Sequence, residues 1–448
     1  MSKCENMTTP IYDFTKQYGE SHTVRFHMPG HKGEEVSGHG RYDITEIKGA
    51  DALYEADGII LESEENASRL FGTGKTIYST EGSSQCIKAM IYIACHLSGE
   101  KRTTILAARN VHKAFIYGVA LCDCDVEWIE GESSDSICSS PITAKEVEQK
   151  IEEMSVKPTA LYITSPDYLG NVQDVEGIAE VCHKNNMILM VDNAHGAYLR
   201  FLPESRHPMD LGADICCDSA HKTLPVLTGG AYLHISKAFN DKCAIDLKKA
   251  MVLFGSTSPS YLILSSLDMC NKYLVQDYKE KLNQTIKVIT KAKEKIRQIG
   301  FSVVHSDPLK IVLKTGNAYL LADSLREDGI ECEYADNEYL VLMITPMNKA
   351  EDIEKLVDSL GSKYADTKTE ALECANRIHD VRLSIRQAMF ADSEVIDVND
   401  SVGRICAAPT VACPPAVPVV ISGEVITEDD VRVLLHYGYT TVEVCRQI

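Results

Sequence analysis

The chain places an acid and a lysine directly after two successive apolar segments. Residues 187–191 are followed by Asp192, and residues 213–217 are followed by an Asp-Ser-Ala-His-Lys sequence that ends in Lys222. Short apolar runs of this kind are typical of buried parallel strands, and an open α/β sheet binds ligands beyond the carboxyl ends of its strands. Either residue alone is usually a surface charge. Together they match the needs of pyridoxal 5′-phosphate (PLP), which requires a carboxylate for its pyridinium nitrogen and an amine for a Schiff base.

Two further segments fit the same interpretation. Gly82, Ser83 and Ser84 precede an expected helix, and such a turn at a helix N-terminus offers N–H groups and hydroxyls to a phosphate. It is also a common plain cap. His112 follows the expected strand at 103–108, where its imidazole could stack on a planar ring, although a histidine after a strand is more often structural.

Hydroxyl groups also gather before a long helical pattern at residues 261–298. Thr257 and Ser258 lie in this turn, and the alternative interpretation is a helix cap formed by Ser258 or Ser260. Asp167 follows another expected strand at the same edge of the sheet, where it could contact a cationic substrate or simply stabilise a turn.

The pattern along the chain predicts an α/β fold with a mostly parallel sheet. Strands alternating with helices indicate βαβ units, and a smaller α+β unit follows. We expect an N-terminal arm at residues 1–50, a large PLP-binding domain at 51–290 and a C-terminal α+β domain at 291–448. The expected strands of the large domain are 103–108, 126–129, 160–164, 187–191, 213–217 and 231–235.

The bulk properties predict a cytoplasmic enzyme with a small-molecule substrate. The chain has 448 residues and a net charge of −20, which disfavours binding to nucleic acids. It shows no apolar signal segment and no window long enough to span a membrane. Sixteen cysteines are scattered without a Cys-x-x-Cys motif, so neither a metal site nor a disulfide framework is expected. A reducing compartment follows.

Several motifs, taken together, resemble the ornithine/lysine/arginine decarboxylase family of fold-type-I (aminotransferase-like) PLP enzymes. The resemblance extends over nearly the whole chain in the expected order and is to the short form, without a response-regulator-like N-terminal domain. The motifs are His27-Met-Pro-Gly-His-Lys32, Asp192-x-Ala-His-Gly196, Ser219-x-His-Lys222 and Thr257-Ser-Pro-Ser-Tyr261.

The resemblance implies a role for each matching position. Lys222 would carry PLP through the Schiff base, Asp192 would keep the ring nitrogen protonated, His112 would stack on the ring and His195 would lie near the ring hydroxyl. The Thr257-Ser258 turn would reach the phosphate of a neighbouring subunit, so a homodimer or a multiple of it is expected. The catalytic set is Lys222, Asp192, His195 and His112, and the other cofactor contacts are Gly82, Ser83, Ser84, Ser219, His221, Thr257 and Ser258.

The implied reaction is α-decarboxylation of arginine, lysine or ornithine, which gives CO2 and a polyamine precursor. Departures from the family pattern keep other functions open. Asn193 replaces a usual Glu, Tyr198 a common His, Asp167 a usual Thr, and Ala408 and Ala416 a usual Glu and Gly. The alternatives are another PLP reaction, such as transamination, elimination or decarboxylation of a different amino acid, and a catalytically inactive PLP-binding homologue.

Overall fold

The computed structural model describes residues 7–35, 38–99, 102–129, 131, 134, 136–363, 379–411 and 414–446. The chain forms two compact units, and each unit combines two stretches of sequence. Met1–Leu97 and Ile188–Leu282 form the first unit, and Ser98–Met187 and Asn283–Ile448 form the second. The domain boundaries expected at residues 50 and 290 stay predictions.

The described residues of the first unit include four strands in the order β1-β7-β6-β5. β5 and β6 run parallel, with Asp192 opposite Cys217, whereas β7 is antiparallel to both β6 and β1. Every residue of β6 and β7 is buried, as expected for strands covered on both faces. The bounds are β1 Lys75–Ser79, β5 Ile188–Asp192, β6 Ile215–Asp218 and β7 Ala231–Ile235.

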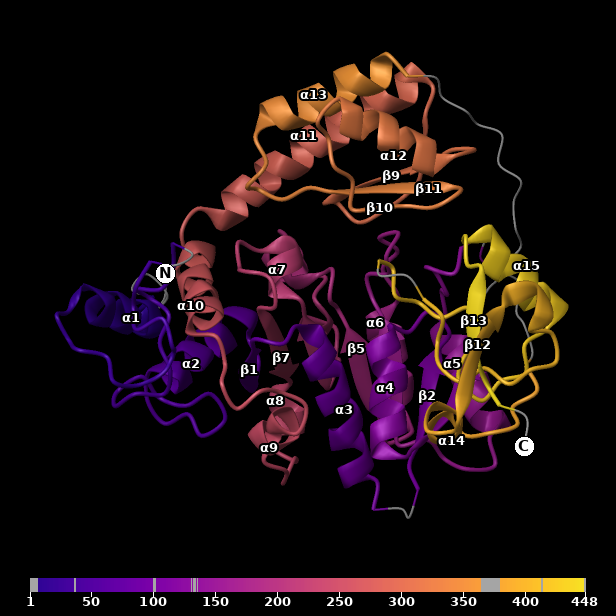
Figure 1. Ribbon diagram of the computed structural model, residues 1–448, viewed down its shortest axis with the longest axis horizontal. Coiled ribbons are helices and arrows are strands. Elements are labelled where there is room, and N and C mark those ends of the chain that lie inside the picture. The colour runs from indigo at the N-terminus through magenta and orange to yellow at the C-terminus, as the bar shows by residue number, and fades with distance from the viewer. Residues whose placement is uncertain are drawn as a thin grey trace. The chain divides into compact units, whose positions relative to one another are not determined.

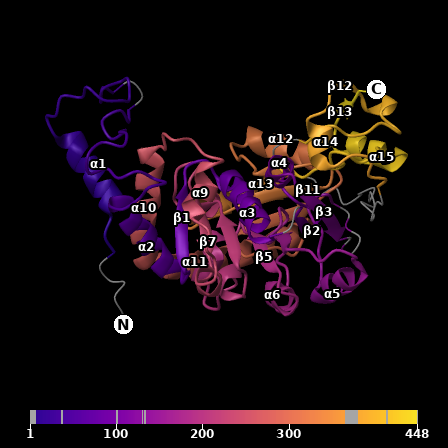
Figure 2. The ribbon, with the colours of Figure 1, turned by 90° about the horizontal axis from the view of Figure 1, so that it is seen from below.

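Helices cover these strands and position the turns beyond them. α3 packs against β1, β5, β6 and β7, and the short α7 lies beyond the upper end of β7 in Figure 1. α1, α2 and α10 pack side by side in both views (Figures 1 and 2). The bounds are α1 Pro10–Glu20, α2 Ile59–Phe71, α3 Ser83–Leu97, α7 Ala220–Thr223, α8 Lys237–Asn240, α9 Leu247–Val252 and α10 Tyr261–Val275, with 3-10 turns at Ala197–Phe201 and Pro208–Asp210.

In the second unit, the strands of the described residues fall into three groups. β4, β2 and β3 run parallel in that order, β10-β11-β9-β8 form an antiparallel sheet, and β12 pairs with β13. One buried cluster joins residues of the two antiparallel groups, including Val312, Val341 and Val444. The bounds are β2 Thr104–Ala108, β3 Asp125–Ile129, β4 Ala160–Thr164, β8 Ser302–Val303, β9 Lys310–Lys314, β10 Tyr334–Ala335, β11 Tyr339–Met343, β12 Ser393–Asp397 and β13 Thr441–Cys445.

The helices of the second unit begin at recognisable caps. α5 has a complete capping box, in which Thr143 accepts from the Glu146 N–H and Glu146 accepts from the Thr143 N–H, as the sequence predicts. α11 contains the boundary between the two units. The bounds are α4 Lys113–Cys122, α5 Ala144–Glu153, α6 Val175–Lys184, α11 Tyr278–Ile299, α12 Ala318–Glu327, α13 Ala350–Gly361, α14 Ile385–Met389 and α15 Glu428–His436, with a 3-10 turn at Val398–Asp400.

All six strands expected in the α/β region are present, and two of them, 160–164 and 231–235, have the expected bounds. One expectation is wrong. The helical pattern at 261–298 forms two helices, because the backbone of Gln276 turns away at ψ −117° although no glycine or proline marks the break. The N-terminal segment contains α1, whose Ile11 and Thr15 lie one turn apart and are buried.

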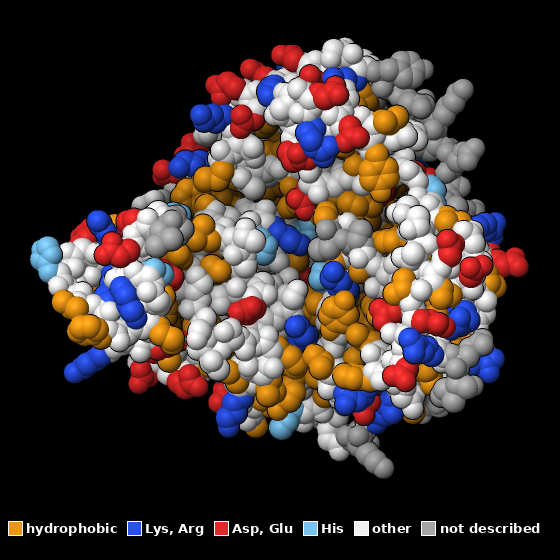
Figure 3. All heavy atoms as spheres, viewed as in Figure 1, with side chains coloured by type: hydrophobic (Ala, Val, Ile, Leu, Met, Phe, Trp, Pro, Cys, Tyr) orange, Lys and Arg blue, Asp and Glu red, His pale blue; other side chains and the backbone are white. Residues whose placement is uncertain are grey.

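The surface bears both signs of charge. Figure 3 shows acidic and basic side chains interspersed on the visible face, which suits solubility better than attraction of one kind of polyion. Among the described residues, no helix combines the length and apolar character needed to cross a bilayer.

Candidate active site

The structure brings Lys222 and His195 together in the first unit. Lys222 lies in α7, directly beyond β6, and His195 lies in the turn that follows β5. Lys222 Nζ is 2.9 Å from His195 Nε2. An amine in contact with an imidazole can exchange a proton with it, which suits a lysine that acts as nucleophile and as acid or base.

Asp192 ends the strand that leads to His195. Its side chain is 2% exposed, and its Oδ1 accepts hydrogen bonds from the Ala194 N–H (3.1 Å) and the Cys217 thiol (3.6 Å). Burial, together with Asp192, raises the pKa of the Cys217 thiol well above its ordinary value. The thiol therefore stays protonated and can donate to the carboxylate.

Hydroxyl groups from two strand ends meet near this lysine. The Ser219 hydroxyl, next to α7, donates to Ser83 Oγ at the start of α3 (2.8 Å). Gly82 has φ +71°, a conformation that favours glycine, and its N–H donates to Gly229 O (2.7 Å). Ser84 lies in the first turn of α3. Two hydroxyls and the N-terminus of a 15-residue helix therefore converge, which is a suitable setting for an anion.

His221 is another of the expected cofactor contacts and lies two residues after Ser219 in the sequence. Its Nδ1 is 3.0 Å from Gly230 O, a contact that joins α7 to the start of β7.

His112 lies in the second unit. It forms the N-cap of α4, and its Nδ1 accepts from the Ala114 N–H (3.1 Å). His112 therefore has a structural role as a helix cap, in line with the alternative to stacking on a ring. Nearby, the Arg109 guanidinium pairs with both oxygens of Glu424 (2.5 and 3.1 Å), and Glu424 is almost completely buried.

Thr257 and Ser258 are exposed in the single chain, and Ser260 is the residue that caps α10, since its Oγ accepts from the Ile263 N–H (3.4 Å). The cap expected in this turn is thus assigned to Ser260. This leaves the hydroxyls of the Thr257-Ser258 turn on the surface.

Asp167 has the geometry of a turn acid. Its Oδ1 accepts from the Asn171 N–H and its Oδ2 from the Asn171 amide, both at 2.9 Å, and the side chain is 1% exposed. Burial raises the pKa of Asp167, against the lowering effect of Asn171. Both oxygens already have donors, so the structure favours the turn role over contact with a substrate cation.

The structure shows the contacts of two residues that depart from the family pattern, Ala416 and Asn193. Ala416 has φ +60°, in the region that favours glycine, and its carbonyl accepts from the Lys113 N–H (2.8 Å) at the start of α4. Asn193 donates to Asp218 Oδ1 (2.7 Å), and both side chains are fully buried.

Neither the Asn193–Asp218 contact nor the Arg109–Glu424 pair is predicted by the sequence pattern. Asp218 directly precedes the Ser-x-His-Lys motif, and this position is the sequence feature that could have indicated a role near Lys222. Glu424 lies 315 residues from Arg109. The pattern of one sequence does not indicate a pair over that separation.

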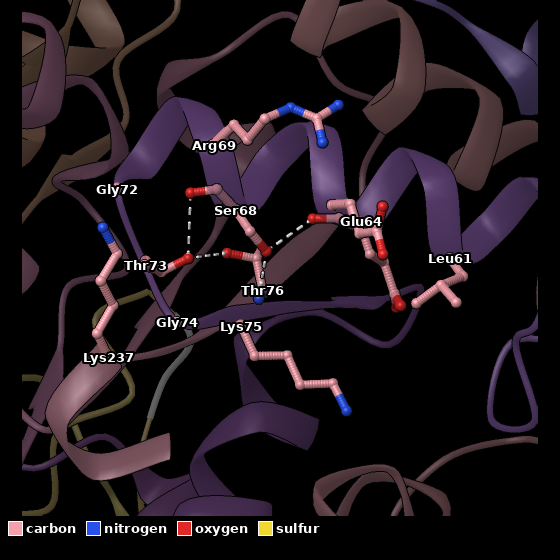
Figure 4. A pocket seen from close by; sticks show the side chains of 11 residues that line it. Leu61, Glu64, Ser68, Arg69, Gly72, Thr73, Gly74, Lys75, Thr76 and Lys237 are labelled. Carbon is pink, nitrogen blue, oxygen red and sulfur yellow. Dashed lines mark hydrogen bonds between the residues drawn. The ribbon is translucent and has the colours of Figure 1, made fainter. Parts of the chain in front are cut away.

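A surface pocket of about 590 Å³ lies away from these residues. Figure 4 shows it where α2 leads into β1, with Lys75, at the start of β1, and Lys237 in its lining. Gly82 and Ser83 follow the opposite end of β1. The pocket is therefore separate from the candidate site.

The family is settled by comparison with known proteins. A family model described as "Orn/Lys/Arg decarboxylase, major domain" matches residues 9–312. The chain belongs to this decarboxylase family. It is 28% identical over 462 residues to the arginine decarboxylase of Bacillus subtilis, with 94% of this chain and 92% of that protein covered.

Solved structures of other enzymes share the fold. The lysine decarboxylase LdcF of Francisella novicida superimposes with a TM-score of 0.81 at 18% identity, covering 98% of this chain and 79% of that chain. A structure of SPT with PLP gives a TM-score of 0.54 at 13% identity, covering 67% of this chain and 75% of that chain. The expected fold-type-I α/β architecture is confirmed.

Proposed function

We propose that this member of the decarboxylase family is a PLP-dependent enzyme that decarboxylates a basic amino acid. The observation that carries the proposal is the contact between Lys222 and His195, 2.9 Å apart, beside the buried carboxylate of Asp192. Membership of the family and the name of the arginine decarboxylase relative support the reaction.

The residues present suit PLP. Lys222 supplies the amine for its aldehyde, Asp192 a buried carboxylate for its ring nitrogen, and the Ser83–Ser219 hydroxyl pair a site for its phosphate. Ser84 and His221 would complete the phosphate contacts. His112 is the residue that we propose for stacking on the ring. Gly82 permits the left-handed turn that presents the serines to the phosphate.

Bound PLP supplies an electron sink for the electron pair that is released when a carboxylate leaves as CO2. The chain's own residues then have distinct tasks. Asp192 holds a proton at the ring nitrogen. Lys222 and His195 share a proton across 2.9 Å, so either can deliver it to the α-carbon of the substrate after CO2 has left.

The substrate class follows from the family, and we rank arginine and lysine ahead of ornithine. The Bacillus subtilis relative is an arginine decarboxylase and the Francisella novicida structure a lysine decarboxylase. A buried cation needs an acidic or carbonyl-rich partner. Arginine would favour a carboxylate that can accept from its planar group in a bidentate geometry. The products are CO2 and agmatine or a diamine, which are polyamine precursors.

A homodimer is the proposed functional unit. The arm exposes alternate apolar side chains, Val24 (72%), Phe26 (94%) and Met28 (63%), which a second copy could cover. The exposed Thr257 and Ser258 would then reach the phosphate of the partner. Phe26→Glu should shift the protein from dimer to monomer in analytical ultracentrifugation with loss of activity. A fully active wild-type monomer at high dilution would contradict the dimer.

We also propose a cytoplasmic location. None of the described cysteines forms a disulfide, which suits a reducing compartment.

A panel assay tests the reaction. Purified protein with added PLP is supplied with arginine, lysine, ornithine and a set of neutral and acidic amino acids, while CO2 and keto acids are measured together. We expect CO2 from at least one basic amino acid and no keto acid. Keto acid in place of CO2 would favour transamination, and CO2 from a neutral or acidic amino acid alone would indicate a different substrate. Absence of any turnover would favour an inactive homologue.

A further inference from the structure

A buried pair of side chains joins the two turns that carry the proposed catalytic residues. Asn193 directly follows Asp192 at the end of β5, and Asp218 directly precedes Ser219 at the end of β6. The Asn193 N–H donates to Cys217 O (2.9 Å), and its side-chain amide donates to Asp218 Oδ1 (2.7 Å). Both side chains are 0% exposed. The pair therefore extends the contact between two parallel strands past their ends.

Two histidines hold Asp218 from the other side. His207 Nε2 and His234 Nε2 lie 3.0 and 3.2 Å from Asp218 Oδ2. The Met209 N–H donates to His207 Nδ1 (3.3 Å), which leaves the proton of that ring on the nitrogen facing Asp218. Burial would raise the pKa of Asp218, but the two histidines lower it below its ordinary value, so the carboxylate is ionised.

The same groups form hydrogen bonds with one another rather than a metal site. His207, Cys216 and Asp218 offer ligand atoms within 4.8 Å of one another. However, burial raises the pKa of the Cys216 thiol well above its ordinary value, with a further rise from Asp218, and its Sγ lies 3.6 Å from Asp218 Oδ1. The thiol and the histidine both present hydrogens to the carboxylate. The polar groups of this cluster are therefore paired with one another by hydrogen bonds.

Asn193 connects the Asp218 carboxylate to the turn that contains His195. The Gly196 N–H donates to Asn193 O (2.8 Å), which closes the turn that contains His195. A Cβ on Gly196 would lie 1.9 Å from Asn193 Oδ1, so the Asn193 side chain is packed directly against this turn. A change in the position of Asn193 would therefore move His195 relative to Lys222.

We propose that Asp218 is a positioning residue for the Lys222 site, which acts through Asn193. Its carboxylate, fixed by His207 and His234, holds the Asn193 amide and thereby sets the separation of His195 and Lys222. The inference rests on the proposed function. This role also gives a reason for the departure at position 193. Asn193 replaces the usual Glu there, and Asp218 supplies an acid from the neighbouring strand instead.

The test compares variants that break the pair with one that restores it. Asp218→Asn places two amides face to face, and Asn193→Ala removes the link while Asp218 keeps both histidine donors. The combination of Asn193→Asp with Asp218→Asn exchanges the two groups, so a donor faces a carboxylate again. Glu64→Gln is the matched control, since Glu64 is a buried acid paired with Lys248 (2.8 Å) outside the candidate site.

Each variant is purified with PLP bound, and kcat, KM, the visible circular dichroism of the cofactor and the melting temperature are measured. We expect both single variants to lose about 10- to 100-fold in kcat, the range that a misplaced catalytic group produces. KM should change little, the visible dichroism should fall, and the exchanged variant should recover both kcat and dichroism. Glu64→Gln should lower the melting temperature without changing kcat or dichroism.

The outcomes separate this inference from the proposed function. If the wild-type protein releases no CO2 from a basic amino acid, the proposed function fails. If the wild-type protein is active and Asn193→Ala keeps its kcat, the positioning role is refuted. It is equally refuted if the exchanged variant recovers its melting temperature but not kcat, because the pair would then be merely structural. Asn193→Ala decides the matter even if Asp218→Asn does not fold.

Discussion

Asp268 should make the stability of the first unit depend on pH in a defined direction. This residue of α10 is 0% exposed and accepts hydrogen bonds from the Ile11 N–H (2.9 Å), the Tyr12 N–H (3.0 Å) and the Ser63 hydroxyl (2.5 Å). Thr9, the N-cap of α1, makes no capping bond with its side chain. Asp268 therefore satisfies N–H groups of the first turn of α1 and attaches that helix to α10.

Burial is the largest influence on the pKa of Asp268 and raises it from 3.8 to about 7, although the three donors lower it. Between these two values the unfolded chain has released its proton while the folded protein keeps it. The contribution of Asp268 to the free energy of unfolding is therefore largest below about pH 4 and falls as the pH rises towards about 7. At about 1.4 kcal/mol for each unit of pKa, ionisation of Asp268 lowers the free energy of unfolding by about 4 kcal/mol.

Asp268→Asn removes this dependence, because the amide does not ionise and keeps an oxygen for the two N–H groups of α1. We expect the variant to match or fall slightly below the wild-type protein near pH 4 and to exceed it by a few kcal/mol near pH 8. Urea denaturation across this range measures the difference. Glu20→Gln, which changes an exposed acid at the C-terminal end of α1, is the control and should follow the wild-type curve. Parallel curves for the wild-type protein and Asp268→Asn would refute the reasoning.

Three further substitutions have expected outcomes. Asp167→Asn should lower the free energy of unfolding by about 1 kcal/mol through its contacts with Asn171 and leave KM unchanged; a raised KM in steady-state kinetics would restore a role in substrate binding. Ala416→Gly should raise the unfolding free energy by about 1 kcal/mol by relieving a left-handed backbone, and no gain in thermal denaturation would argue against strain there. Glu424→Gln should lower it by about 3 kcal/mol, because the charge of Arg109 loses its buried partner; a loss below 1 kcal/mol would show that the pair contributes little.

The sequence predicted the elements that form the site because their signals are local. Apolar runs of about five residues mark β5 and β6. Asp192 ends the first strand and Lys222 closely follows the second, and ligands bind beyond the carboxyl ends of such strands. The cap at Thr143 is likewise encoded within four residues. These features need no knowledge of the rest of the fold.

The remaining features depend on contacts between distant segments. His207 and His234 meet at Asp218 only because the strands are placed side by side, and neither histidine lies in a recognisable motif. The break at Gln276 arises from backbone geometry that its residue type does not enforce. The sequence places Asp167 at the edge of the sheet where ligands bind, which makes it a candidate partner for the substrate. Only the structure shows that Asn171 donates hydrogen bonds to both of its carboxylate oxygens.

Reduction with borohydride tests the central claim most directly. The purified protein with PLP is treated with borohydride, digested, and searched by mass spectrometry for the lysine that carries the reduced cofactor. We expect modification at Lys222 in the wild-type protein and none in Lys222→Ala, which should also release no CO2 from arginine, lysine or ornithine. Trapping of the cofactor on another lysine, such as Lys32, or activity that survives in Lys222→Ala would contradict the account.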